Sequence, residues 1–217
     1  VTVKPAPAEM HEALTYDFTD LQPDSVVVAL EWDKLAVPFK VSVNVPEVAV
    51  ASIRNQLRSV PGFTWQGYND AATYCLEHKT NYDDALKWVD TSIQAGDHFA
   101  NEQTKSKLLA ATGKTAEADA AMKQALSVAE PLDLHNYGRQ LLGEKKTTEA
   151  LQIFDMNAKK NPSLWFVYVG LARGQSATGK FKDASKNMHV AQTRAPESQH
   201  AYLQGLIDKL DKGQDIN

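Results

Sequence analysis

The chain has 217 residues, of which 43% are hydrophobic and 23% are charged, and its formal net charge is −4 at pH 7. This length allows a sizeable core in one or two domains. The weak acidic charge, without any basic run, gives no reason to expect a nucleic-acid partner. No apolar run approaches the roughly 18 residues of a membrane span.

Residues 1–45 are predicted to form a small antiparallel β-element, because β-branched and aromatic residues are frequent there. Asp33-Lys34 is the predicted hairpin turn between the last two strands, and Trp32 is expected in the sheet core. Four such strands need a covering layer. We therefore interpret the segment as the tail of a larger β-domain, entered at a processing boundary at Val1, and association through a β-edge stays open. The expected strands cover residues 1–4, 13–18, 25–32 and 37–43.

From Pro46 onward the apolar period changes to that of helices. Pro46 and Glu47 suit the first turn of a helix, which ends before Pro61-Gly62. Glycine and proline then punctuate a series of helices, and together these form the predicted helical domain, residues 46–217. The first helices of the pairs are expected over 63–78, 98–112, 132–144 and 164–178, the second helices over 82–95, 115–129, 147–160 and 181–194, and a capping helix over 197–212.

Four alanines in the second helices recur at intervals of 33, 32 and 34 residues. A bulky apolar residue follows each alanine four positions later, and small residues let the paired helix axes approach closely. A helix-pair repeat near 34 residues is the period of tetratricopeptide arrays. The alanines are Ala85, Ala118, Ala150 and Ala184, and the bulky residues are Val89, Met122, Phe154 and Met188.

Residues 63–196 resemble the tetratricopeptide family. The resemblance implies a mostly α fold: an α-α superhelix of about four helix pairs plus a capping helix, whose concave face binds a protein or peptide. The first pair departs from the pattern, since Thr80 stands where glycine is usual. An irregular helical bundle is the alternative. The best matches are Tyr137-Gly138 … Ala150 … Phe154 … Pro162 and Leu171-Ala172 … Gly179 … Ala184 … Met188 … Ala191 … Pro196.

A second resemblance would cover most of the chain. It rests on the segments 16–18, 32–39, 51–57 and 61–67, which are similar to the uncharacterised bacterial domain-of-unknown-function family 2911. This resemblance implies an extracytoplasmic setting, periplasmic or secreted, and an N-terminal β-domain of which residues 1–45 are the tail. The family has no assigned activity.

No catalytic, cofactor or metal motif is visible in the sequence. The six histidines form neither an HExxH motif nor a histidine–cysteine cluster, and no GxSxG, P-loop or GxGxxG motif occurs. Cys75 is expected to be a small buried hydrophobe, and Trp65, Trp88 and Trp165 are expected in helix cores. The segment 170–174 favours helix packing over a phosphate loop. We therefore predict no enzyme activity, no cofactor and no metal.

Aligning the repeats on their alanines produces a row of bases. The residues eleven positions before each alanine are Tyr74, Lys107, Arg139 and Arg173, and His135 lies one turn before Arg139. In tetratricopeptide arrays the first helix of each pair lines the concave face. Three successive bases there suit an acidic or carboxylate-ended peptide. The alternative is a solvated helix face paired with neighbouring acids.

The sequence thus favours a non-enzymatic scaffold that binds a protein or peptide. One alternative is an accessory helical domain of an extracytoplasmic enzyme or ligand-binding protein whose site lies in an N-terminal β-domain outside this sequence. Another is a structural oligomerisation module.

Overall fold

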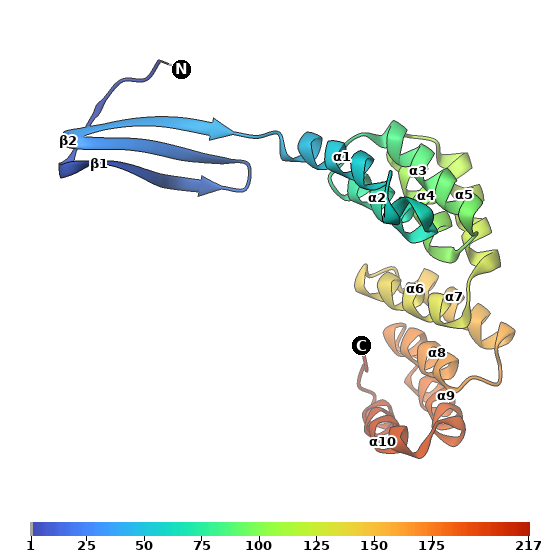
Figure 1. Ribbon diagram of the computed structural model, residues 1–217. Helices are drawn as coiled ribbons and strands as arrows, with labels where there is room; N and C mark the ends of the chain where they lie inside the picture. The colour runs from blue at the N-terminus through green and yellow to red at the C-terminus, as the bar shows by residue number, and fades with distance from the viewer. Residues whose placement is uncertain (1) are drawn as a thin grey trace. The chain divides into compact units, whose positions relative to one another are not determined.

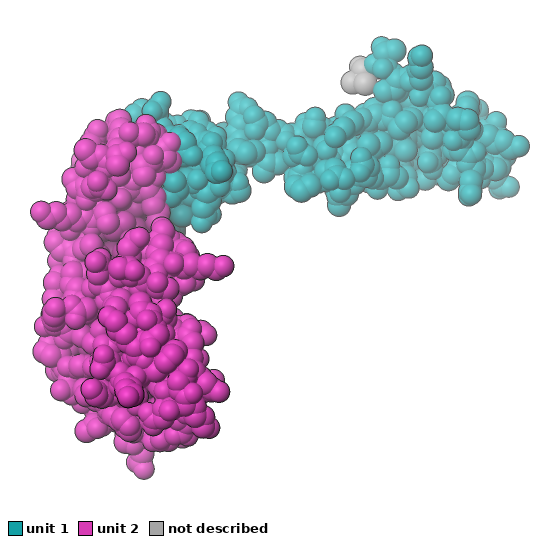
Figure 2. Space-filling view, turned by 180° about the vertical axis from the view of Figure 1, so that it is seen from behind, with its two compact units in different colours: residues 1–88 teal, residues 89–217 magenta. Residues whose placement is uncertain are grey.

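The computed structural model describes residues 2–217, which form a two-stranded sheet followed by ten α-helices and one short 3-10 helix (Figure 1). The chain divides into two compact units, Val1–Trp88 and Val89–Asn217, coloured separately in Figure 2. The predicted fold class, a helical-repeat array preceded by a small antiparallel β-element, is confirmed. The predicted domain boundary at residue 45 stays a prediction.

The sheet is one long hairpin. Strand β1 (Ala6–Gln22) pairs antiparallel with β2 (Ser25–Ser42), and Pro23-Asp24 forms the turn between them. The prediction of four strands was wrong. The expected strand at 13–18 is part of β1, the two expected at 25–32 and 37–43 both lie in β2 up to Ser42, and residues 2–4 precede the sheet.

The predicted turn at Asp33-Lys34 lies inside β2. Asp33 takes a positive φ of 53° and stands opposite His11, between shifts in the strand register. A residue of this kind makes a bulge that bends a strand without reversing it, so the two-residue period breaks there although the chain continues. Trp32 is 62% exposed, against its expected place in a sheet core, because the described sheet has only two strands.

The first helix, α1 (Val45–Gln56), starts as predicted. The Asn44 side chain accepts a hydrogen bond from the backbone N–H of Glu47 at 3.4 Å, and Pro46 lies in the first turn. The helices of the pairs agree with their predicted ranges to within two residues. After η1 (Val60–Phe63) come α2 (Trp65–Glu77), α3 (Tyr82–Ala95), α4 (Phe99–Ala111), α5 (Thr115–Val128), α6 (Pro131–Gly143), α7 (Thr147–Lys160), α8 (Trp165–Ala177), α9 (Phe181–Arg194) and α10 (Glu197–Asp211).

The first helix of every pair, and α10 as well, ends in the same turn. The residue two positions past the helix takes a positive φ, and the next backbone N–H donates to the carbonyl five residues back. This is the Schellman arrangement, which satisfies carbonyls at a helix end. Glycine adopts the positive φ without strain, yet lysine occupies the position twice. The five residues are Lys79, Gly113, Lys145, Gly179 and Gly213.

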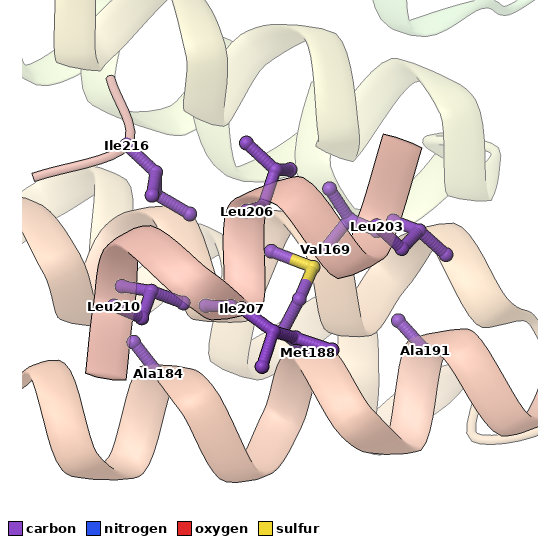
Figure 3. Packing of buried hydrophobic residues seen from close by; sticks show 10 residues of the cluster. Val169, Ala184, Met188, Ala191, Leu203, Leu206, Ile207, Leu210 and Ile216 are labelled. Carbon is purple, nitrogen blue, oxygen red and sulfur yellow. The ribbon is translucent and has the colours of Figure 1, made fainter. Parts of the chain in front are cut away.

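The repeat alanines are buried, as close packing of paired helices requires. Ala85, Ala150 and Ala184 have no exposed surface, and Ala118 is 4% exposed. Within the second unit, α4 packs on α5, α6 on α7 and α8 on α9, and α10 packs on α9. Its C-terminal core joins α8, α9 and α10 through Met188 and the apolar stripe of α10, as Figure 3 shows.

Phe154 of α7 explains why α6 and α8 carry glycine. Its side chain is fully buried, and a Cβ placed at Gly138 would lie 2.4 Å from its Cε1 atom. A Cβ at Gly170 would lie 2.6 Å from the Cδ1 atom. Glycine therefore leaves the space that the aromatic ring fills, and α6 and α8 also contact each other directly. The segment 170–174 packs within a helix, as predicted.

Candidate binding face on helices α4, α6 and α8

The candidate site lies on the first helices of the pairs in the second unit. Lys107 on α4, Arg139 on α6 and Arg173 on α8 hold the same position in successive repeats. We call these three residues the basic row. His135 lies one turn before Arg139 on α6, and its pKa is lowered by burial and by the charges of Arg139 and Arg173.

Lys107 is exposed, and its ammonium group donates a hydrogen bond to Gln103 Oε1 at 3.1 Å. Partial desolvation lowers the pKa of Lys107, and the carboxylate of Glu144 acts in the opposite direction. Glu144 also accepts hydrogen bonds from Lys146 and Gln140, which hold its pKa below the usual range. The first base of the row therefore has an acidic neighbour in the next repeat, but it keeps its access to solvent.

Arg139 is exposed on α6, and within residues 2–217 no hydrogen bond or ion pair engages its guanidinium group. His135 beside it is half-buried, with ring centroids 6.0 Å from Phe154 and 5.8 Å from Phe166. Burial lowers the pKa of His135 to about 4, and the charges of Arg139 and Arg173 add to the effect. The imidazole is therefore neutral at pH 7, and its buried Nδ1 atom has no hydrogen-bond partner among the residues that the structure describes.

Arg173 differs from the other two bases, because the chain itself covers it. The residue is 8% exposed. Its Nη1 donates to the carbonyl oxygen of Ile216 at 2.6 Å, and its Nη2 donates to the hydroxyl of Tyr202 at 3.0 Å. The expectation that all three bases lie open in one row does not hold for Arg173, since the segment after α10 lies on it. Its Nε atom is buried and has no hydrogen-bond partner in the described part of the chain.

Tyr74 belongs to the first unit and is described with it. Its ring centroid lies 4.2 Å from that of His78, and the side chain lines a cavity of about 330 Å³ together with Ile53 and Leu57 of the α1 end. Whether Tyr74 binds a partner stays a prediction, as it does for Lys107, His135, Arg139 and Arg173.

The cysteine and the helical tryptophans that were predicted to be structural are buried or half-buried. Cys75 is fully buried, and burial raises the pKa of its thiol, with Asp84 adding to the effect. Trp65, Trp88 and Trp165 are half-buried. In the described part of the chain, no group of three or more histidine, cysteine or acidic side chains could hold a metal ion. None of the helices described there has the length and apolarity that a bilayer crossing needs.

Sequence reasoning missed the residues that surround Arg173. Ser176 donates a hydrogen bond to Asp215 Oδ1 at 2.6 Å, and Tyr202 is contributed by α10. Burial acts to raise the pKa of Asp215, but hydrogen bonds from Ser176, Asn217 and the backbone together hold it below its usual range. Gly213 holds the same repeat position as Gly179, and this equivalence is the sequence signal that predicts a turn after α10.

Comparisons with known proteins found similarity among solved structures. No family model matches the chain, so the resemblance to domain-of-unknown-function family 2911 stays a prediction, and no curated protein matches either. Among solved structures, the chain is similar to YrrB, described as a tetratricopeptide-repeat (TPR) protein with an unusual peptide-binding site. Identity is 16%, the match covers 75% of this chain and 84% of that one, and the TM-score is 0.41. A second similar structure is the C-terminal part of a TPR repeat-containing protein from Cytophaga hutchinsonii, at 17% identity, 76% and 80% coverage and a TM-score of 0.31.

Proposed function

We propose that the chain is a non-enzymatic scaffold that binds an extended protein segment on the face formed by α4, α6 and α8. The observation that carries the proposal is Arg139, whose exposed guanidinium group has no partner among residues 2–217 and lies beside the neutral ring of His135. Lys107 holds the same position one repeat earlier and is also exposed. A carboxylate is the partner that a guanidinium group binds best, since it can accept two parallel hydrogen bonds.

The neighbourhood of Arg139 supports recognition more than catalysis. Burial, together with the charges of Arg139 and Arg173, lowers the pKa of His135 to about 4, so the ring is neutral and poorly suited to act as a general base near pH 7. Phe166, whose ring lies edge-on to His135, adds an apolar surface next to these polar groups.

The test begins with a peptide library displayed on phage and selected on the intact chain. The consensus peptide is then titrated by calorimetry against the wild type, Arg139→Glu and a matched control, Lys123→Glu, which reverses an exposed charge on α5. We expect Arg139→Glu to weaken binding at least about tenfold, or 1.4 kcal/mol, and Lys123→Glu to leave it unchanged.

The dependence of the affinity on salt concentration provides a second measurement in the same experiment. Charges exposed to solvent are screened beyond about 10 Å at 0.1 M ionic strength, so wild-type affinity should fall between about 50 mM and about 500 mM salt. The Arg139→Glu variant should show a smaller dependence. Equal affinities of the wild type and Arg139→Glu would favour the alternative, in which the basic row is a solvated helix face that binds no partner.

A second candidate function is favoured by the hairpin. Its large apolar side chains are uncovered, with Phe18 69% and Leu21 80% exposed, and a two-stranded sheet alone is marginally stable in water. Further strands of an extracytoplasmic enzyme or ligand-binding protein would cover them, and the helices would then be an accessory domain. The extracytoplasmic setting in this proposal rests on the resemblance to family 2911. If a longer natural chain supplies such a layer, the near-UV circular dichroism of Trp32 in that chain would differ from its signal in residues 1–217.

A further inference from the structure

The segment after α10 folds back onto α8. Gly213 takes a φ of 69°, and the backbone N–H of Gln214 donates to the carbonyl of Lys209 at 3.0 Å, closing the same turn that ends α8. Residues 214–217 then have neither helical nor strand structure and lie on the surface of α8 that carries Arg173 and Ser176. We call residues 213–217 the C-terminal segment.

Two side chains of α8 hold the C-terminal segment mainly through its backbone. Arg173 Nη1 donates to the carbonyl oxygen of Ile216 at 2.6 Å, and the Ser176 hydroxyl accepts a hydrogen bond from the backbone N–H of Ile216 at 3.1 Å. In return, Asn217 Nδ2 donates to the Arg173 carbonyl at 3.1 Å. Ser176 also donates to the Asp215 carboxylate at 2.6 Å. Any extended chain with an acidic residue at the position of Asp215 could make the contacts of Ile216 and Asp215.

The side chain of Ile216 fills an apolar position. It is 6% exposed and belongs to the cluster that contains Val169 of α8 and Leu206 and Leu210 of α10 (Figure 3). An acid followed by an aliphatic residue is therefore the pattern that this surface accommodates. The acid binds at Ser176, and the aliphatic side chain is removed from water between α8 and α10.

The equivalent positions in the two preceding repeats indicate how exposed this surface would be without the C-terminal segment. Lys107 and Arg139 hold the position of Arg173 in the two preceding repeats, and both are exposed. Arg173 is buried by contacts that come from α10 and from the C-terminal segment. The covered arginine thus belongs to the same row as the proposed binding residue Arg139, at the end nearest α10.

We propose that the C-terminal segment occupies the end of the peptide-binding face in the manner of a ligand, and that a partner segment carrying an aspartate followed by an aliphatic residue displaces it. The inference rests on the proposed function and names both its ligand chemistry and its regulation. Because the occupant is tethered, its effective concentration lies in the millimolar range expected for short flexible links. A free peptide with the same contacts competes poorly until the tethered segment is released.

The experiment uses the intact chain in three forms and one labelled peptide. The probe is an acetylated, amidated peptide with the sequence of residues 213–217, followed by fluorescence anisotropy. Ile216→Asp places a charge in the apolar position and releases the segment. Gln214→Asp is the matched control, because it adds the same charge to the same segment at an exposed side chain. We expect the probe to bind Ile216→Asp at least tenfold more tightly than it binds the wild type or Gln214→Asp.

Circular dichroism first establishes that Ile216→Asp is folded. If it is not, Asp215→Ala replaces it as the releasing variant, since it removes the carboxylate bound by Ser176 without adding a buried charge. Hydrogen exchange of the wild type provides a second measurement. The Ile216 amide should exchange at least tenfold more slowly than an unstructured amide, because it is bonded to Ser176 in a buried position.

Three results would overturn the inference. The probe could bind the released and wild-type chains with equal affinity, or it could bind neither. The Ile216 amide could also exchange at the rate of an unstructured peptide. The proposed function is judged separately. Library peptides that lose affinity in Arg139→Glu but bind Ile216→Asp no more tightly than the wild type would leave the scaffold function standing and would contradict the displacement mechanism.

Discussion

Several large apolar side chains are exposed in the hairpin, whereas most of those in the helix pairs are buried or half-buried. Phe18 and Trp32 of the hairpin are 69% and 62% exposed, whereas Phe154 of α7 has no exposed surface. A strand sends successive side chains to opposite faces, and a two-stranded sheet covers neither face. A helix gathers its apolar residues on one stripe, and the next helix of the array covers that stripe. The helical array therefore contains its own core, while the hairpin needs a layer that the described residues do not supply.

The largest effect that tests this comparison is expected from Phe154→Ala. Removing a fully buried ring from between Gly138 and Gly170 leaves a cavity, because glycine has no side chain that could move into it. Such substitutions destabilise by about 3–5 kcal/mol, which urea unfolding followed by circular dichroism would measure. Phe63→Ala is the matched control: Phe63 is 84% exposed, and its truncation should change stability by less than about 0.5 kcal/mol.

Ala150→Leu is expected to have the next largest effect. Ala150 is fully buried where α6 packs on α7, next to Leu141 and Phe154. Extra methyl groups there should destabilise by about 1–3 kcal/mol through overpacking, seen as a lower melting temperature. Ala120→Leu on the exposed side of α5 is the control. An unchanged melting temperature for Ala150→Leu would contradict the role of the repeat alanines as contact points.

His135 should make stability depend on pH. Its pKa is about 4 in the folded chain, below the ordinary value of 6.5, because burial and the charges of Arg139 and Arg173 disfavour the protonated ring. Between these two values the unfolded chain binds more protons than the folded one. The stabilisation is thus complete above about pH 6.5 and is lost as the pH falls toward 4. The ring is only partly buried, so we expect a loss of about 1–2 kcal/mol, less than the full linkage value.

Urea unfolding at several pH values between about 4 and 7.5 measures this dependence. The His135→Gln variant should show a flatter profile than the wild type, whereas His189→Gln, which changes an exposed histidine of α9, should not. Equal slopes for His135→Gln and the wild type would assign the acid sensitivity to other groups.

The smallest effect is expected in the hairpin. Phe18→Ser changes an exposed side chain of β1, and we expect less than about 0.5 kcal/mol of change in the free energy of unfolding. Sedimentation over a range of concentrations accompanies the measurement. A destabilisation above about 1 kcal/mol, or a dependence on concentration in the wild type alone, would show that Phe18 is covered in solution by another layer or a second copy.

Much of the helical fold could be predicted because its signals are local. Proline, glycine and the apolar period fix where each helix starts and ends, so α7 and α9 lie over the predicted ranges. The strands were harder, because a break in the two-residue period can be a turn or a bulge. Asp33 is a bulge residue with a positive φ, and the turn is at Pro23-Asp24.

The candidate site was predictable only in part. The shared repeat position of Lys107, Arg139 and Arg173 follows from the sequence alone, and so does their placement on the first helices of the pairs. The burial of Arg173 does not, because it depends on Ile216, which lies 43 residues away along the chain. Neither the apolar period nor a local motif predicts a contact between a helix and a non-helical segment that lie 43 residues apart in the sequence.

The equivalent turns after α4, α6, α8 and α10 also bear on how the second unit is made by the ribosome. Each turn is closed by hydrogen bonds between residues close in sequence, and low contact order of this kind accompanies fast folding. At about 5–20 residues per second of synthesis, a repeat of about 34 residues emerges roughly every 2–7 s, far longer than helices need to form. Each new helix pair of the second unit can therefore dock on the pair before it while translation continues. The α8 surface becomes covered only when the residues after α10 have been synthesised.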